Sequence, residues 1–386
     1  MTPQHRRLVL PAAILFVSLN ALLFYTNLHL VSESEHRVLE PPTVQSAVDR
    51  PLPKDCQYFV DRAANPGQRF LSANGQIIQN IPETGIPKRI SFVHYNARFK
   101  NPRYLCALES ATRQNPLHSI AVYAKNMSDF DAVLRKVGLS LNVTVLDLRW
   151  RDMFASTPLQ PWYGSGTYLQ SKWVDQNLGN AFRLAVLWNV GGTYLDLDVV
   201  SLNPLSGLGR TLANQTGPSI PSNAFFSFPK NDLFVWEMMK EFVVGFNGTV
   251  WGRNGPRMVE RTYNNICLPR KGEPPVKRPY CNLSIAPREI FFPFSYANRN
   301  KSLRPWREHC GTMKTLSDRS IGLHWWNKGM KGADIEVDTT LQAIMRHHCP
   351  LVYKTFGAKG LGFFSPRDVA FGKGSEWSGY EENDGF

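Results

Sequence analysis

The sequence predicts an α/β fold in which parallel strands alternate with helices. From residue 86 onward, short apolar runs typical of strands alternate with longer helical runs, at intervals that suit parallel β-α-β units. Of the 386 residues, 43% are hydrophobic, enough to bury one large core or two modest ones. A nearly all-apolar helix that stops at Gly191-Gly192 also leads directly into a strand.

The same patterns place each element along the chain. Apolar periodicity, proline positions and capping residues give their order and bounds. The predicted elements are a strand within 86–96, a helix over 103–114, a strand over 119–124, a helix over 128–137, a strand over 142–148, a helix that Asn180 caps and Gly191 ends, strands over 193–200 and 223–228, a helix over 232–245, a helix that begins at Pro256, a strand within 320–328 and a helix over 339–348.

The net charge of +13 suits a nucleic acid, an anionic membrane surface or a phosphorylated substrate equally well. The basic residues are spread along the chain, without a long Lys/Arg block and without a recognisable nucleic-acid motif. We therefore expect no nucleic-acid partner.

Residues 8–30 contain no charged side chain and are long enough to cross a bilayer. Basic residues precede this stretch and acidic residues follow it, which predicts a type II signal anchor with residues 1–7 in the cytosol. A cleaved signal peptide is the alternative, but no small-x-small cleavage site follows the apolar run. The proline-rich residues 31–85 are expected to form a stem, and residues 367–386 a loose polar tail.

Sequons and cysteines agree with a luminal location. Asn-x-Ser/Thr acceptors occur at Asn126, Asn142, Asn214, Asn247, Asn282 and Asn300. None of the six cysteines lies in a CxxC pair, which favours disulfides over zinc. Of the fifteen full pairings that six cysteines allow, sequence proximity favours only Cys267 with Cys281.

Asp196 and Asp198 follow the Gly191-Gly192 break, without a basic neighbour in the sequence. On an extended chain, side chains two residues apart point the same way. Two carboxylates arranged in this way offer oxygens to a hard cation such as Mg²⁺ or Mn²⁺. The pair therefore predicts a cation site at the end of a strand.

Arg183 is a lone charge in the apolar helix and needs an anionic partner. Asn180 lies three residues earlier, on the same face of the helix. Both residues would contact a ligand beside the aspartates, unless Arg183 instead pairs with a core carboxylate. A cation between the aspartates would allow a nucleotide diphosphate to bind there, with His324 and Lys328 as a further ligand and a phosphate contact. A lone histidine is more often a packed or surface residue.

Several segments together resemble the alpha-1,4-glycosyltransferases of glycosyltransferase family 32. They are Ile86-Pro-Lys88, Cys106 to Ala111, Thr157 to Tyr163, Arg183 to Gly192 with Tyr194 to Asp198, Trp251-Gly252 with Gly255-Pro256, His324 with Trp326-Asn-Lys328, and Cys349-Pro350. The resemblance covers roughly residues 86–355 and omits the stem and the tail.

This resemblance implies a GT-A fold, that is, a Rossmann-like mixed sheet with helices on both faces, over residues 86–366. It also implies a Golgi type II membrane protein that uses a UDP-sugar donor with Mn²⁺ or Mg²⁺ and retains the anomeric configuration. Asp196, Asp198 and His324 would then hold the metal, and Asn180 and Arg183 would belong to the catalytic centre. The predicted donor-binding residues are Phe92, His94, Gly192, Tyr194, Asn223, Asn327 and Lys328.

Family members often carry Asp where this chain has Asn180, so this position is the first place to look for altered specificity. We expect a hexosyltransferase that adds galactose from UDP-galactose, in alpha-1,4 linkage, to a glycolipid or glycan. Transfer of N-acetylgalactosamine or N-acetylglucosamine, or a non-catalytic carbohydrate-binding role on the same fold, are the alternatives. A glycosidase is disfavoured, because its two carboxylates would face each other across a cleft.

Overall fold

The computed structural model describes residues 85–99, 101–216, 220–269, 279–304, 316, 318–327, 329–330 and 339–361. The predicted anchor, nearly all of the stem and the tail lie outside these residues. In the part of the chain that is described, no helix is long and apolar enough to cross a membrane.

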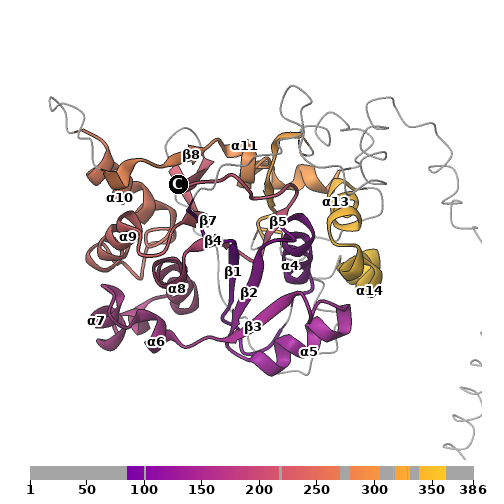
Figure 1. Ribbon diagram of the computed structural model, residues 1–386, viewed down its shortest axis with the longest axis horizontal. Coiled ribbons are helices and arrows are strands. Elements are labelled where there is room, and N and C mark those ends of the chain that lie inside the picture. The colour runs from indigo at the N-terminus through magenta and orange to yellow at the C-terminus, as the bar shows by residue number, and fades with distance from the viewer. Residues whose placement is uncertain are drawn as a thin grey trace, which may run out of the picture. The chain divides into compact units, whose positions relative to one another are not determined.

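A mixed seven-stranded sheet forms the centre of the described domain (Figure 1). Its order is β3-β2-β1-β4-β7-β6-β8. The first four strands in this order run parallel, β7 is antiparallel to β4, and β6 is antiparallel to β7 but parallel to β8. The strands are β1 (Arg89–His94), β2 (Ser119–Ala124), β3 (Val143–Asp147), β4 (Gly192–Leu195), β6 (Thr211–Thr216), β7 (Ile220–Phe228) and β8 (Ser284–Ala286). The predicted α/β class is thus confirmed.

Helices cover both faces of this sheet (Figure 1). One apolar cluster joins the sheet to α4 (Arg103–Gln114), α5 (Met127–Val137), α13 (Thr340–His348) and α14 (Pro350–Leu361). The other cluster joins it to α6 (Trp150–Phe154), α7 (Leu159–Gly164), α8 (Val174–Val190), α9 (Leu233–Val244) and α10 (Pro256–Cys267). Successive strand residues alternate between the clusters, as Phe92 and Val93 do in β1.

Several short elements complete the domain. Two short strands, β5 (Val199–Ser201) and β9 (Gly322–His324), pair antiparallel as a separate sheet. Four short helices, η1 (Thr167–Gln170), η2 (Pro279–Cys281), α11 (Arg288–Phe291) and η3 (Tyr296–Leu303), lie in connections. Sequence periodicity did not predict α6, α7, β6, β8, α14 or these four short helices, and most of them are short runs that carry little periodic signal.

Two predicted elements differ from the structure. The sequence predicted that Asn180 caps the long apolar helix. The helix instead begins at Val174, so Asn180 lies inside α8. The strand predicted over 193–200 is interrupted, because β4 ends at Leu195 and β5 begins only at Val199. The two predicted metal-binding aspartates therefore lie in a turn between two strands.

The glycine pair ends α8 as predicted. Gly191 and Gly192 have positive φ angles of 67° and 95°. A Cβ on Gly191 would lie 2.5 Å from the backbone nitrogen of Lys230, and one on Gly192 would lie 2.5 Å from the carbonyl oxygen of Arg89. Only glycine satisfies both the backbone conformation and this close approach.

Two disulfides cross-link the domain, one of them across 243 residues of sequence and the other across 14. The predicted Cys267–Cys281 bond is present, and a second bond joins Cys106 in α4 to Cys349 before α14. One turn along α4, both carboxylate oxygens of the buried Glu109 accept hydrogen bonds of 2.9 Å from the first amides of α14. α4 therefore fixes α14 both covalently and through a helix cap. The other two cysteines lie outside the described residues.

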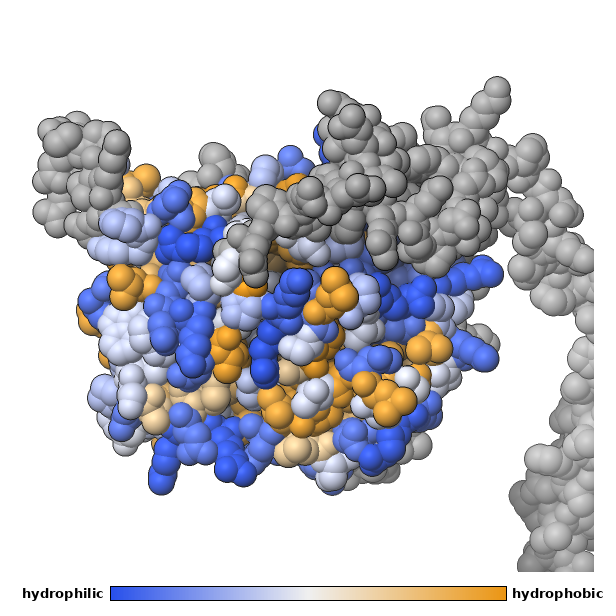
Figure 2. Space-filling model, viewed as in Figure 1, coloured by the Kyte–Doolittle hydropathy of each residue, from blue (hydrophilic) through white to orange (hydrophobic). Residues whose placement is uncertain are grey.

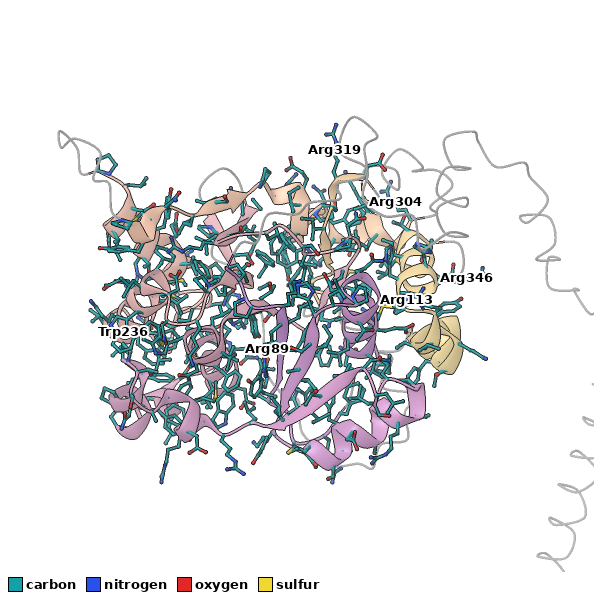
Figure 3. All side chains as sticks on the ribbon, viewed as in Figure 1. Arg89, Arg113, Trp236, Arg304, Arg319 and Arg346 are labelled. Carbon is teal, nitrogen blue, oxygen red and sulfur yellow. A yellow bond between two sulfur atoms is a disulfide. The ribbon has the colours of Figure 1, made fainter. Side chains whose placement is uncertain are left out.

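Polar side chains cover most of the surface shown in Figure 2, around separate apolar patches. Arginines lie on several separate elements: Arg113 lies in the last turn of α4 and Arg346 in that of α13, and Arg304 and Arg319 lie toward the same side (Figure 3). In the described domain, basic charge is thus distributed over several elements rather than along one helix.

Candidate active site

A tight turn between β4 and β5 carries the two aspartates. The amide of Asp196 donates to the carbonyl of Ala224 in β7 (2.9 Å), and the amide of Val199 donates back to the carbonyl of Asp196 (3.0 Å). Leu197, between the aspartates, is buried in the core. The sequence pattern had suggested that the two carboxylates point the same way on an extended chain. They converge instead because the chain turns between them.

Arg183 binds Asp196 through both ends of its guanidinium. Its Nη2 lies 3.1 Å from Oδ1 of Asp196 and its Nη1 lies 3.2 Å from Oδ2. The hydroxyl of Tyr194 donates to Oδ1 (2.8 Å), and the guanidinium lies over the Tyr194 ring. The anionic partner that Arg183 needs is therefore Asp196 itself, thirteen residues further along the chain.

Burial raises the pKa of Asp196; Arg183 opposes this rise, the nearby Asp198 adds to it, and the net direction is upward. Two carboxylates this close together repel each other when both are ionised. Asp196 therefore depends on Arg183, or on a cation, to remain charged.

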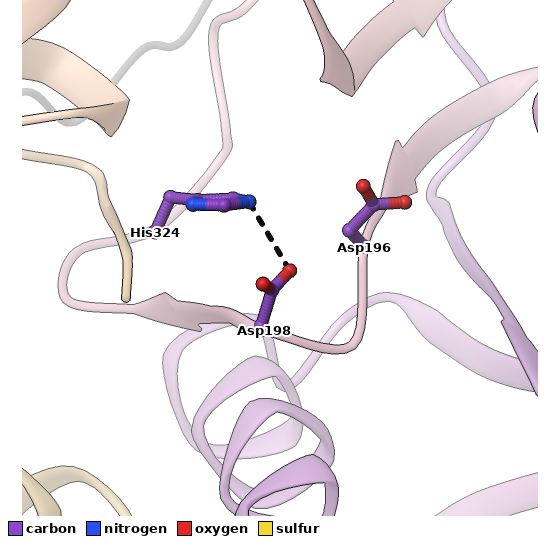
Figure 4. Close-up of side chains that lie close together, drawn as sticks. All are labelled: Asp196, Asp198 and His324. Atoms are coloured by element: carbon purple, nitrogen blue, oxygen red, sulfur yellow. Dashed lines mark ion pairs between the residues drawn. The ribbon is translucent and has the colours of Figure 1, made fainter. Parts of the chain in front are cut away.

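Asp198 faces β9. The Nε2 atom of His324 lies 3.2 Å from Oδ1 of Asp198 (Figure 4). The amide of Asn327 donates to Oδ2 (3.1 Å). The pairing of β5 with β9 places His324 opposite Val199, directly after the aspartates. Burial raises the pKa of Asp198, but His324 and the amide of Asn327 together lower it by more, so the net direction is downward. Asp198 therefore stays ionised.

Trp326 has a left-handed backbone, with φ 55°, which is unusual for a bulky residue. Its indole donates to the carbonyl of Phe294 (2.8 Å), and its ring packs against His324 at a centroid distance of 4.4 Å. Such a conformation persists only where the surroundings hold it in place. The bend turns the amide of Asn327 toward Asp198.

Asp196, Asp198 and His324 fit a divalent cation. One ligand atom from each lies within 4.8 Å of the others, and no other group of three or more His, Cys, Asp or Glu residues with this spacing occurs among the described residues. Two carboxylates and one imidazole suit Mn²⁺ or Mg²⁺ better than a thiophilic metal. The amide of Trp326 donates to Nδ1 of His324 (3.2 Å), which leaves the ring proton on Nε2. A cation held by Nε2 would take the place of this proton.

Asn180 and Asn223 form one wall beside Arg183. The Nδ2 of Asn223 donates to Oδ1 of Asn180 (2.8 Å), and the carbonyl of Asn223 accepts a hydrogen bond from Arg183. Asn180 lies one turn before Arg183 in α8, on the same face. The sequence predicted this shared face correctly, whereas the contact with Asn223 in β7 depends on the tertiary fold.

A second polar group lies at the end of β1. His94 is 3% exposed and is surrounded by the rings of Phe99, Tyr104 and Phe130, and its Nε2 has no hydrogen-bond partner. Buried polar atoms usually have partners, so this nitrogen marks a position for a ligand or a water molecule. Ligands of open α/β sheets bind outside the carboxyl ends of the parallel strands, which is where His94 lies.

Tyr95 and Tyr104 approach the aspartates and were not predicted. Burial raises the pKa of Tyr95, with further contributions from Tyr104 and then Asp196. Burial, followed by Asp198, raises the pKa of Tyr104 to about 12. Both hydroxyls therefore remain protonated. The position of Tyr95 directly after a parallel strand is the signal that could have identified it.

The structure does not bring every predicted residue to the cluster. Gly192 lies at the start of β4, about 13 Å along the strand from Asp196, and its conformation has a structural cause. The side chain of Phe92 is fully buried in the core. Asn327 binds Asp198 through its backbone, while both polar atoms of its side chain are buried without a partner. Lys328 lies outside the described residues.

We expect His94 to make the stability of the domain depend on pH. Burial lowers its pKa from 6.5 to about 4, although Asp129 opposes this. Between these values the unfolded chain binds more protons than the folded chain, so stability is complete above the unfolded pKa and decreases as the pH falls. The free energy of unfolding, measured by urea denaturation, should fall by about 2 kcal/mol from about pH 7 to about pH 5 because of this group. A His94→Phe variant should lack this share of the decrease, and an unchanged pH dependence would contradict the prediction.

Two family models match successive parts of the chain. Residues 101–220 match the glycosyltransferase sugar-binding region containing the DXD motif, and residues 227–356 match the alpha 1,4-glycosyltransferase conserved region. Asp196 and Asp198 lie within the first region, and His324 lies within the second. The two halves of the candidate cation site therefore come from different matched regions.

Individual relatives agree with these matches. The lactosylceramide 4-alpha-galactosyltransferase of Mus musculus is 28% identical over 284 residues, which cover 71% of this chain and 77% of that protein. The alpha-1,4-N-acetylglucosaminyltransferase of Homo sapiens is 26% identical over 280 residues, which cover 69% of this chain and 79% of that protein. Among solved structures, the PaToxG glycosyltransferase aligns with 80% of this chain and 95% of its own, at 13% identity and a TM-score of 0.40.

Proposed function

We propose that this chain, which belongs to the alpha-1,4-glycosyltransferases, transfers a hexose from a UDP-sugar to a glycolipid or glycan and retains the anomeric configuration. The observation that carries the proposal is the convergence of Asp196, Asp198 and His324 beside Arg183. The parallel strands with helices on both faces agree with a GT-A fold. A Golgi location, with residues 8–30 as the anchor and the catalytic domain in the lumen, belongs to the same proposal.

A divalent cation bound at this site would supply positive charge to the departing diphosphate. The chain's own residues prepare the site for it. Arg183 and Tyr194 fix both oxygens of Asp196, while His324 and the amide of Asn327 fix Asp198. Ligands held in this way do not reorganise during the reaction, which is the main source of electrostatic catalysis. Lys328 would add a contact to the diphosphate.

The polar atoms without partners support a donor site of this kind. His94 lies at the carboxyl end of β1 with its Nε2 unpaired, and Asn327, whose backbone amide binds Asp198, has an unpaired carboxamide. We assign His94 to the nucleoside side of the donor and Asn327 to the diphosphate side. Asn180 and Asn223, beside Arg183, would face the transferred sugar and the acceptor.

Galactose is the first candidate for the transferred sugar, because several relatives are named as galactosyltransferases. N-acetylglucosamine is the second, because another relative is named as an N-acetylglucosaminyltransferase. N-acetylgalactosamine remains a further candidate. Asn180 is the residue through which we expect the choice to be made, since it lies beside Arg183 with its Oδ1 already bound to Asn223.

A panel of UDP-sugars tests the function. We expect the chain to hydrolyse one UDP-hexose or UDP-N-acetylhexosamine with Mn²⁺ clearly faster than the other donors, and Asn180→Asp to change the order of preference. Release of UDP is the measurement, with each donor supplied alone. Tight binding of UDP without turnover of any donor would contradict the proposal and favour a non-catalytic carbohydrate-binding protein.

A further inference from the structure

Residues 247–255, which we call the α10 loop, lie along the face of α8 that leads to the candidate active site. At the far end, the carbonyl of Gly248 accepts hydrogen bonds from the amide of Lys172 (3.0 Å) and the hydroxyl of Ser171 (3.1 Å). At the near end, a Cβ on Gly255 would lie 2.7 Å from Nδ2 of Asn223 and 3.3 Å from Nδ2 of Asn180. The loop therefore connects the start of α8 with the wall of the site.

One buried side chain ties the two ends of the α10 loop together. Asn254 is 3% exposed, and its Nδ2 donates to Oδ1 of Asn177 in α8 (3.1 Å) and to the carbonyl of Asn247 (2.8 Å). Its Oδ1 accepts from the amide of Asn247 (2.9 Å). A loop held in this way presents its exposed side chains in a fixed arrangement, which reduces the entropy lost when a ligand binds.

Two tryptophans meet where the middle of the α10 loop passes the start of α8. Trp173, directly before α8, and Trp251 pack edge to face with ring centroids 5.3 Å apart. Trp251 is 49% exposed, and it alone is exposed among the tryptophans that the structure describes. An indole is a large apolar surface with one polar edge, which suits a ligand with both kinds of group.

The distance along α8 indicates which part of a ligand would reach this pair. Seven residues separate Trp173 from Asn180, which corresponds to about 10 Å along a helix axis. Two linked hexose rings span such a length. A sugar that receives the new bond beside Asn180 and Asn223 would place its neighbour over Trp251.

We propose that Trp251, supported by Trp173, binds the second sugar of the acceptor, counted from the sugar that receives the new bond. The apolar face of this sugar would pack on the exposed indole, while its hydroxyls would remain in water. The inference rests on the proposed function, because it takes the neighbouring site to be the transfer site. The continuity of the α10 loop with that site favours a saccharide over other ligands for an exposed aromatic side chain.

Acceptors that differ by one sugar test this proposal. The full chain in detergent, with its preferred UDP-sugar and Mn²⁺, is assayed with octyl galactoside, octyl lactoside and octyl N-acetyllactosaminide. We expect Trp251→Ala to raise the KM for the disaccharide acceptors on the order of tenfold, the loss expected from one exposed ring face. The KM for the monosaccharide acceptor and donor hydrolysis without acceptor should not change.

Two variants serve as controls. Trp251→Phe keeps an aromatic face and should restore most of the disaccharide affinity, whereas Leu141→Ala removes a side chain that is 97% exposed before β3 and should have no effect. An unchanged disaccharide KM in Trp251→Ala would overturn the proposal, as would an equal loss of donor hydrolysis, which would indicate a structural role. If the unaltered chain hydrolysed no UDP-sugar, the proposed function itself would fail, and this inference with it.

Discussion

Asp198→Asn is expected to reduce UDP-sugar turnover on the order of a thousandfold, the scale on which one electrostatic group at a reacting centre acts. The substitution removes the negative charge but keeps one oxygen, which can accept from the amide of Asn327 as Oδ2 does, while the new NH2 group faces His324. The local structure should therefore survive while cation binding is lost. Steady-state UDP release with Mn²⁺ measures the effect, and a chelator should reproduce it in the unaltered chain.

Two comparisons separate lost charge from lost structure in this variant. The thermal unfolding temperature of Asp198→Asn should fall by only a few degrees, because the substitution gives up one hydrogen bond, the one with His324. Excess Mn²⁺ should restore little activity, since the ligand itself is missing. Full turnover by Asp198→Asn, or by the unaltered chain in chelator, would contradict a role for this residue in a catalytic cation site.

Arg183→Met is expected to lower both stability and activity. It leaves the carboxylate of Asp196 and the carbonyl of Asn223 without their buried partner. Breaking a buried ion pair from one side costs about 3 kcal/mol in the free energy of unfolding. The pKa of Asp196, already raised by burial, should rise further. Turnover should fall on the order of a hundredfold, and most strongly at the acidic end of the pH range.

Arg210→Met provides the matched control, because Arg210 also binds a carboxylate, Asp232, at 2.6 Å, but lies directly before β6. Its side chain is 20% exposed, against 8% for Arg183, so it is also largely buried and its loss should likewise lower stability. Activity should not change in this control. Equal losses of activity in the two variants would show that Arg183 acts only through general stability. Arg183→Lys keeps the charge but not the fork, and its activity should lie between the two.

Periodicity predicted most of the sheet and the long helices, since buried faces repeat along the chain. It failed where a tertiary contact decides the local structure. Gly179 and Asn180 suggested a helix start, yet α8 continues through them, and a Cβ at Gly179 would approach the ring of Tyr95 to 3.2 Å. This glycine permits close packing inside the helix. The ring that it accommodates belongs to a different part of the sequence.

The candidate site shows the same division. The pair Asp196 and Asp198 was identifiable from its position after an apolar helix, and Arg183 from its isolation there. Leu197 continues the apolar alternation through the turn, so the break between β4 and β5 left no signal in the pattern. The convergence of His324 depends on the pairing of β5 with β9, more than a hundred residues apart in the chain. Only the tertiary fold brings these three residues together.

Binding of Mn²⁺ to the chain, followed by electron paramagnetic resonance in the presence of UDP, tests the central claim most directly. We expect the unaltered chain to bind a single Mn²⁺ at the site formed by Asp196, Asp198 and His324, with Asp198→Asn and His324→Ala each losing this binding. Leu141→Ala should bind as the unaltered chain does. Undiminished Mn²⁺ binding by both site variants would contradict the claim that these three residues form the cation site.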